Sequence, residues 1–467
     1  MQESSQDKAT PKPQFEIRDV EGWKVYISKA SLVEKKEETE SALDHMANQL
    51  FQIKLVVPKK TLRELQRVPI WLANGEERLG IAFHPKSSWL TERDYQPPDL
   101  PLMIGVVRGK NYLHASIRQP WLVFHELVHG YDWLVLGKQQ KYGIDAGLYE
   151  RAMKSGKYVS ALHWDSRYRK PYHAANRMEL FAETSEAFFG TNDIYPFVRA
   201  ELRAHDPKLF RELASLWNVD LDGQRRSSRA LAKTLESSPL ISGLEEAAKG
   251  SDESAAPAYA PTRRYARCNI EGWNVLIGPE LEKSPKLAEK ARRLLRRDLH
   301  YVKRYVPAEA VKKLKRTKIW LEKDNPDVPY LTFHASDKHL ASRGDNVDKA
   351  GAVEIGNAEN YLRWFGREPS IILHMLAYAY LQSEIDGGND DLATALSRAR
   401  KSGRYDKVLR FDGQRVRHPA LANQYEFFAE LSETYFGTND HYPFIRGELK
   451  EADGKTCKII SRLWTSK

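Results

Sequence analysis

The spacing of hydrophobic and polar residues predicts a row of short strands followed by helices. Apolar and polar residues alternate over Phe15–Ser28, which predicts a pair of β-strands, and the charged amphipathic stretch Leu32–Leu55 predicts a helix. Three further strands and four further helices are predicted at Val68–Leu72, Arg78–Phe83, Leu102–Val107, Pro120–Leu136, Gly147–Lys154, Ala174–Phe189 and Tyr195–Trp217. Because the strands precede the helices, we expect an α+β fold.

The same plan occurs twice along the chain. The Glu-Gly-Trp motif at 21–23 recurs at 271–273, and the Gly-Thr-Asn-Asp motif at 190–193 recurs at 437–440. Ordered matches at a constant offset are typical of a tandem repeat. We therefore predict two homologous domains at residues 15–220 and 264–467. A leader at 1–14 precedes them and a linker at 221–263 joins them.

One predicted helix of the first repeat carries a motif that can bind a metal. His125, Glu126 and His129 form the pattern H-E-x-x-H. Positions four apart lie on one face of a helix, so both imidazoles can reach the same ion. Glu126 lies beside them, where it can act as general base on a water molecule. The alternative interpretation is a pair of unrelated buried histidines.

A later predicted helix can complete this set. Glu179 and Glu183 lie four residues apart and are surrounded by apolar residues. Buried carboxylates need partners, because an unpaired buried charge is costly. We predict Glu179 as the third metal ligand and Glu183 as the residue that orients a ligating imidazole, with Asn176 supporting the site. The alternative is a salt-bridged pair on a surface helix.

The two motifs together resemble a known group of enzymes. The H-E-x-x-H motif followed by Glu-Leu-Phe-Ala-Glu at 179–183 is similar to the gluzincin metallopeptidases, in particular the branch of anthrax lethal factor and Pro-Pro endopeptidase. The resemblance implies zincin-like domains, one zinc ion and a peptide or protein substrate. In that branch a tyrosine seven residues before the glutamate ligand stabilises the oxyanion, and Tyr172 holds that position here.

The second repeat has lost three groups of this site. In place of Glu126, His129 and Tyr172 it has Met375, Tyr378 and Pro419. Methionine cannot activate water, so we predict that this repeat is catalytically inactive. Because Tyr378 replaces a metal ligand, we also expect it to be free of metal. We expect its retained His374, Glu426 and Glu430 to form a hydrogen-bonded core network, with a weak metal site as the alternative.

The remaining histidines divide by whether both repeats have them. His84 recurs as His334, and survival in the inactive copy favours a role in the fold. His163 and His173 occur only in the first repeat. They are secondary candidates for substrate contact or proton transfer, and a surface position is the alternative for each.

Composition adds three limits. The net charge is +10, but Lys and Arg are scattered among Asp and Glu and no recognition motif accompanies them, so we expect no nucleic-acid partner. No apolar run approaches the ~18 residues of a membrane helix. The two cysteines, Cys268 and Cys457, either form one disulfide or stay unlinked.

These observations favour a secreted or cell-envelope zinc endopeptidase, with a cytoplasmic location as the alternative. The second repeat would then serve substrate or partner binding, or stability. Two other functions fit the same residues: a binding protein built from two relic zincin domains, and a zinc hydrolase acting on a non-peptide amide or ester. The oligomeric state is not predicted.

Overall fold

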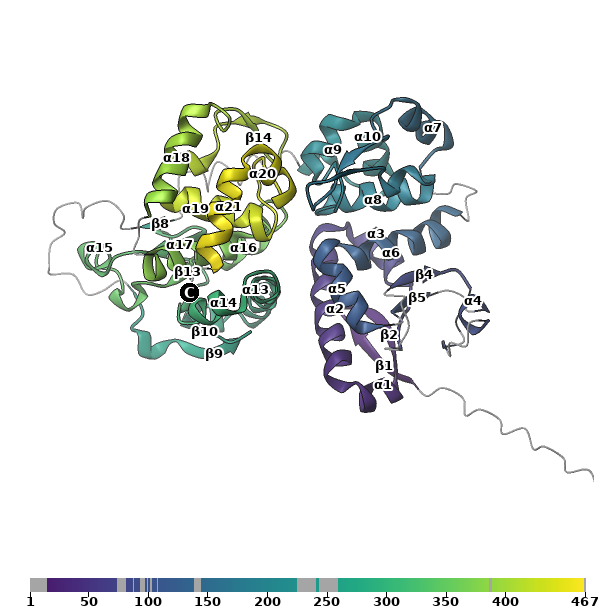
Figure 1. Ribbon diagram of the computed structural model, residues 1–467. Coiled ribbons are helices and arrows are strands. Elements are labelled where there is room, and N and C mark those ends of the chain that lie inside the picture. The colour runs from purple at the N-terminus through teal and green to yellow at the C-terminus, as the bar shows by residue number, and fades with distance from the viewer. Residues whose placement is uncertain are drawn as a thin grey trace, which may run out of the picture. The chain divides into compact units, whose positions relative to one another are not determined.

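The chain combines many helices with small β-sheets (Figure 1). It divides into two compact units. The computed structural model describes residues 15–73, 81–86, 88–92, 97–98, 100, 103–106, 108–137, 144–224, 241–242, 259–385 and 389–465. The first unit consists of residues 1–154 and 172–186, and the second of residues 155–171 and 187–467. The units thus differ from the predicted domains, because parts of the first repeat belong to the second unit. The predicted leader lies outside the described residues.

A mixed sheet forms the base of the first unit. Its five strands, in spatial order, are β1 (Phe15–Val20), β2 (Trp23–Ser28), β3 (Ile70–Leu72), β5 (Met103–Val106) and β4 (Ala82–His84). β1 is antiparallel to β2, the strands β2, β3 and β5 are parallel, and β4 is antiparallel to β5. β4 therefore lies at an edge of this sheet.

The sheet of the second unit repeats this arrangement and adds one strand. Its spatial order is β8 (Ile241–Ser242), β12 (Leu331–His334), β13 (Val353–Ile355), β11 (Ile319–Leu321), β10 (Trp273–Ile277) and β9 (Ala266–Ile270). From β9 to β12 the strand directions match those from β1 to β4. β8 pairs in parallel with β12, so the predicted linker contributes a strand. The linker residues 225–240 and 243–258 lie outside the described residues.

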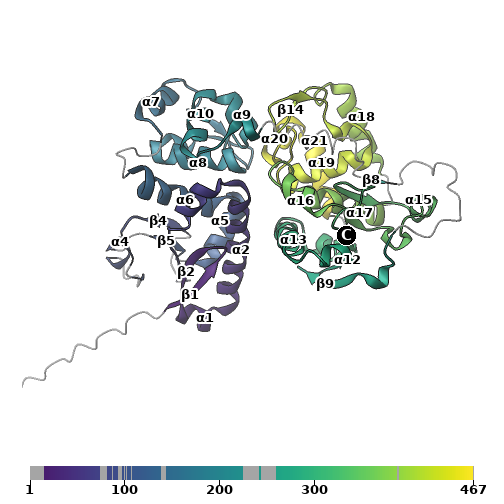
Figure 2. The same cartoon turned by 180° about the vertical axis from the view of Figure 1, so that it is seen from behind.

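The first unit contains ten helical elements in the part of the chain that the structure describes. They are α1 (Lys29–Glu34), α2 (Lys36–Val56), α3 (Lys59–Leu65), α4 (Ser88–Thr91), α5 (Gly109–Arg118), α6 (Leu122–Tyr131), η1 (Asp132–Leu136), α7 (Ala146–Lys154), η3 (Tyr172–Ala174) and α8 (Arg177–Phe189), whose last turn belongs to the second unit. α6 packs against α2, α3, β4 and β5 (Figure 2). The predicted helix Pro120–Leu136 is thus α6 continued by the single π-helical turn η1.

The second unit contains the remaining elements. From the first repeat these are β6 (Ala161–Leu162), β7 (Tyr168–Arg169), α9 (Arg199–His205) and α10 (Pro207–Leu216). From the rest of the chain they are η4 (Thr262–Arg264), α12 (Pro279–Glu282), α13 (Pro285–Tyr305), α14 (Ala308–Leu314), α15 (Asp337–Ser342), η5 (Val347–Lys349), α16 (Ala358–Trp364), α17 (Ile371–Glu384), α18 (Asp390–Ser402), β14 (Val408–Leu409), β15 (Arg415–Val416), η6 (Pro419–Leu421), α19 (Gln424–Phe436), α20 (Arg446–Ala452) and α21 (Gly454–Thr465). Among the described residues, none of the helices is both long enough and apolar enough to cross a membrane.

The prediction of one helix over Tyr195–Trp217 is wrong. The chain forms α9 and α10, and Asp206 separates them. Pro207 begins α10, because proline disfavours helical geometry in the residue before it and is tolerated in the first turn. The Asp206 carboxylate then accepts the N–H of Leu209 at 3.1 Å and caps the new helix.

Equivalent tryptophans anchor the two sheets in the same way. Trp23 and Trp273 are completely buried, and their indole N–H groups donate to the carbonyls of Leu65 and Leu314 at 3.0 and 3.1 Å. Burying an aromatic ring while satisfying its polar atom stabilises a core strongly. In the second unit Cys268 and Cys457 are both free thiols, so the disulfide alternative is not realised.

Candidate metal centre

The candidate site is built on α6, the most apolar helix of the first unit. Its apolar side chains are buried on every side, so His125 and Glu126 are buried with them. Gly130 lets the helix approach Val68, because an added Cβ would lie only 2.7 Å from a methyl carbon of that valine. Close packing at Gly130 thus sets the depth at which the two histidines lie.

α8 brings Glu179 to the two imidazoles of α6. The Nε2 atoms of His125 and His129 lie 3.1 Å apart. Oε2 of Glu179 lies 3.2 Å from Nε2 of His125 and 3.5 Å from Nε2 of His129. The three donor atoms that we predicted as metal ligands therefore converge, all within 4.8 Å of one another.

This donor set fits a zinc ion. Two imidazoles and one carboxylate are a common ligand set of catalytic zinc, which leaves a fourth position open. Two imidazole nitrogens 3.1 Å apart cannot both present bare lone pairs to each other, so a proton or a cation has to lie between them. A bound cation would take over the role of that proton.

The charges around the site also favour a cation. Burial lowers the pKa of His125, but the hydrogen bonds that its ring donates to the carboxylates of Glu179 and Glu186 outweigh burial and raise the pKa well above its usual value. Burial raises the pKa of Glu179, yet its hydrogen bonds to both histidines bring this pKa down to about 2. The carboxylates thus stabilise positive charge at the point where the three donors meet.

Glu126 lies next to the donor atoms, on the side of β4. Its side chain is 8% exposed, and Oε2 accepts the backbone N–H of Phe83 at 2.6 Å. Burial raises the pKa of this carboxyl, and the charges of His125 and His129 offset part of the rise. A glutamate with a raised pKa takes up a proton more readily than an ordinary carboxylate, as a general base must.

The residue that orients His125 is Glu186 rather than the predicted Glu183. Oε1 of Glu186 lies 2.8 Å from Nδ1 of His125, whereas Glu183 lies 3.9 Å from the same atom. Gln119 donates to Oε1 of Glu186 at 2.7 Å and holds it in place. Glu186 is seven residues after Glu179, two helical turns along the same face, and this spacing was the signal that could have identified it.

Two other predicted residues of the site lie at the start of α8. The side chain of Asn176 accepts the N–H groups of Met178 and Glu179 at 2.9 and 3.0 Å, so it caps the helix that carries the third ligand. Tyr172 is 61% exposed and is hydrogen-bonded to Glu179, whose charge is the main reason that the pKa of Tyr172 is raised. Its hydroxyl is thus close to the candidate ligands and open to solvent.

The other histidines of the first repeat lie elsewhere. His173 is completely buried, so the alternative of a surface position is wrong for it, and substrate contact or proton transfer stays a prediction. His163 lies in the second unit, where its ring nitrogens are 3.1 Å from Asp165 and 3.3 Å from Asp193. His84 is buried in β4, and burial lowers its pKa to about 4, which keeps the ring neutral.

In the second repeat, a tyrosine hydroxyl replaces one of the ligands. The hydroxyl of Tyr378 lies 2.6 Å from Nε2 of His374, and Glu426 lies 3.6 Å from the same nitrogen. The opposite nitrogen of His374 is 2.8 Å from Glu433, the counterpart of Glu186. Glu430 accepts from Asn439. Of the predicted network, His374 and Glu426 are neighbours, whereas Glu430 bonds to Asn439 and Glu433 holds the place beside His374.

Comparisons of the chain with protein-family models, with curated proteins and with solved structures found no match.

Proposed function

We propose that the protein is a zinc-dependent metallopeptidase whose active site lies in the first repeat. The observation that carries this proposal is the convergence of His125, His129 and Glu179, with the carboxyl of Glu126 beside them. The sequence motifs alone predict ligand types, whereas the meeting of α6 and α8 supports a single site. The zincin-like fold and the gluzincin relationship belong to the same proposal.

In this mechanism each residue has one task. His125, His129 and Glu179 hold the zinc ion, which when bound supplies Lewis-acid activation of water and of the peptide carbonyl. Glu126 takes the proton that the attacking water loses and delivers it to the leaving amine. The hydroxyl of Tyr172 donates a hydrogen bond to the developing oxyanion, a role that its exposure permits.

The test is Glu126→Gln in the full chain. Glutamine cannot accept the proton but leaves the metal ligands in place, so we expect one zinc per chain and a rate reduced about a thousandfold or more, near the upper range for loss of a general base. Zinc is measured by elemental analysis and cleavage with a peptide library. Glu150→Gln, an exposed glutamate on α7, is the matched control and should change neither.

Other results would point to other functions. Full peptide turnover by Glu126→Gln contradicts the mechanism. A carefully purified wild-type chain without metal favours a binding protein built from relic domains. A chain that binds zinc but cleaves no peptide favours a hydrolase of non-peptide amides or esters, since that chemistry uses the same groups.

A further inference from the structure

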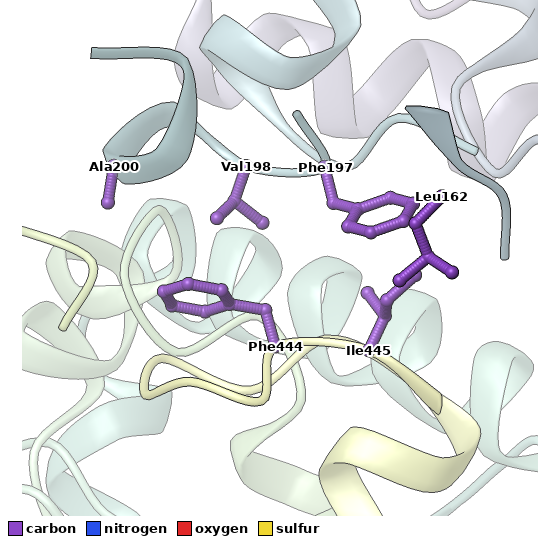
Figure 3. Packing of buried hydrophobic residues seen from close by; sticks show 6 residues of the cluster. All are labelled: Leu162, Phe197, Val198, Ala200, Phe444 and Ile445. Carbon is purple, nitrogen blue, oxygen red and sulfur yellow. The ribbon is translucent and has the colours of Figure 1, made fainter. Parts of the chain in front are cut away.

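Within the second unit, equivalent parts of the two repeats pack against each other. A buried apolar cluster joins side chains from both repeats, namely Leu162, Phe197, Val198, Ala200, Phe444 and Ile445 (Figure 3). Phe444 and Ile445 are the counterparts of Phe197 and Val198. The hydroxyls of Thr191 and Thr438, also counterparts, lie 2.7 Å apart. A contact in which equivalent residues meet is isologous, as in a two-fold symmetric dimer.

Two equivalent glutamates meet at this contact. Glu201 and Glu448 are 4% and 3% exposed, and their side chains are hydrogen-bonded to each other. Each is the third residue of its helix, Glu201 in α9 and Glu448 in α20. The pair therefore links the starts of two equivalent helices, one from each repeat.

Backbone amides hold one oxygen of each carboxyl. Oε2 of Glu201 accepts the N–H of Phe197 at 2.8 Å and that of Val198 at 3.4 Å. Oε2 of Glu448 accepts the equivalent N–H groups of Phe444 and Ile445 at 2.7 and 3.4 Å. The amides thus fix one oxygen of each carboxyl in the same way in both repeats.

A hydrogen bond between two carboxyls requires a proton, because a carboxylate can only accept. Burial raises the pKa of Glu201, and burial together with the charge of Glu201 raises the pKa of Glu448 well above its usual value. Two bare carboxylates in this position would repel each other across an apolar contact. The geometry therefore calls for one shared proton in the folded protein.

No basic side chain in the described part of the chain is among the main causes of the raised pKa values of Glu201 and Glu448. The titratable groups that face the pair are the phenols of Tyr195 and Tyr442. Burial raises the pKa of each phenol, and the two carboxyls raise it as well. Of the charged residues on the same helices, Arg199 and its counterpart Arg446 lie over the rings of Phe188 and Tyr435. Arg203 donates to the carbonyl oxygen of Asp412, Glu451 accepts from Tyr168, and Lys450 is exposed. A proton is thus what neutralises the pair.

The contact also includes the segments that precede Tyr172 and follow α8 along the chain. The hydroxyl of Tyr168 donates to Glu451 at 2.7 Å, and an added Cβ at Gly447 would lie 3.0 Å from the carbonyl oxygen of Trp164. This segment of the first repeat leads directly into Tyr172. The segment that contains Glu201 follows α8, which carries Glu179 and ends at Phe189.

We propose that the second repeat is a built-in dimer partner, which anchors the segments before Tyr172 and after Glu186 through an isologous contact that depends on a proton shared by Glu201 and Glu448. When the pair loses this proton, the contact loosens. The anchoring role rests on the proposed function, whereas the contact and its proton do not.

The test compares hydrogen exchange of the full chain at pH 6 and pH 9, in peptides that cover residues 193–205 and 440–452, after correction for intrinsic exchange. Because the folded pKa values of both glutamates are raised, the stabilisation is complete below their usual range and is lost as the pH rises through the folded values. In the wild type we expect the opening equilibrium to rise by up to about tenfold per pH unit in this range.

Two single variants replace the proton by an amide. In Glu448→Gln or Glu201→Gln, the amide oxygen can accept the two backbone N–H groups while the NH2 group donates to the remaining carboxylate. We expect these variants to keep their protection at pH 9. The double variant places two NH2 donors face to face, so we expect it to lose protection at both pH values.

Three results would overturn the proposal. One is wild-type protection that does not change with pH, which needs no variant to measure. Another is an equal pH dependence in the wild type and both single variants. The third is a double variant as well protected as the single ones, because simple removal of buried charge would give that result. The hydrogen-exchange measurement needs neither zinc nor catalytic activity. A failure of the proton-dependent contact can therefore be distinguished from a failure of the proposed function.

Discussion

At the scale of single residues, the hydrogen bond between Glu186 and Nδ1 of His125 decides which nitrogen faces the candidate ligands. With Nδ1 held by a carboxylate, Nε2 is directed toward His129 and Glu179. Carboxylates that hold the remote nitrogen of a ligating histidine also increase its basicity. In the proposed zinc site, Glu186 would therefore act on metal affinity through His125 and without contacting the ion itself.

This role predicts the effect of Glu186→Gln. A neutral acceptor orients the imidazole less strongly, so we expect zinc affinity to fall about 10- to 100-fold, as for other residues that support metal ligands. Zinc titration with a competing chelator measures the change.

The second repeat offers a matched control for this variant. Glu433 makes the same contact with His374, also at 2.8 Å. Glu433→Gln should therefore disturb the fold to a similar degree while leaving zinc affinity unchanged. An equal loss of affinity in both variants would mean that Glu186 acts through folding alone.

At the scale of elements, α6 is positioned by close contact between Gly130 and Val68. The equivalent residues of the second repeat are Ala379 and Thr317. Ala379 has a methyl group that Gly130 lacks, and Thr317 has a hydroxyl in place of one methyl group of Val68. Val68 is completely buried and its branched side chain has little rotamer freedom.

Gly130→Ala tests this packing. Alanine favours a helix over glycine by about 1 kcal/mol. The new Cβ would lie 2.7 and 3.0 Å from the two methyl carbons of Val68, and such overpacking costs about 1–3 kcal/mol. Because Val68 cannot turn away, we expect the clash to dominate and the free energy of unfolding to fall.

Denaturant unfolding of a double-mutant cycle with Val68→Ala measures this effect. We expect a favourable coupling of about 0.5–3 kcal/mol, because the smaller residue at 68 makes room for the added methyl group. Additive effects would show that the two positions do not press on each other.

At the scale of the whole molecule, the two repeats differ in chemistry at matching positions of the same framework. Their sheets share strand order and direction, and the contact at Glu201 and Glu448 relates them by equivalent residues. In the second repeat the hydroxyl of Tyr378 lies against His374 at the position where the first repeat has a second imidazole. One side chain therefore separates the second repeat from a complete ligand set.

We accordingly expect Tyr378→His to create a second metal site. The new imidazole would join His374 and Glu426, whose carboxylate already lies 3.6 Å from Nε2 of His374. Elemental analysis should give two zinc ions per chain in place of one. Peptide cleavage should not increase, because Met375 cannot act as a base. An unchanged metal content would show that the second repeat has lost the geometry as well as the ligand.

Much of this arrangement could be predicted where the determinants are local. The strand pair at Phe15–Ser28 and the α6 helix follow from residue spacing, because backbone geometry sets periods of two and 3.6 residues. The facing positions of His125 and His129 follow from the same helical period. The break between α9 and α10 was predictable in principle, since Asp206 and Pro207 are a common helix start.

The sequence by itself determined the repeat, most strands and helices, and the residue types available for a metal, because these depend on neighbours within a few turns of chain. Only the tertiary structure decided that Glu179 meets His125 across 54 residues, that Glu186 rather than Glu183 holds the imidazole, and that His173 is buried. It likewise decided that Glu201 meets Glu448. Such contacts depend on how whole elements pack, and several arrangements of one helix face satisfy the same spacing until a partner surface selects among them.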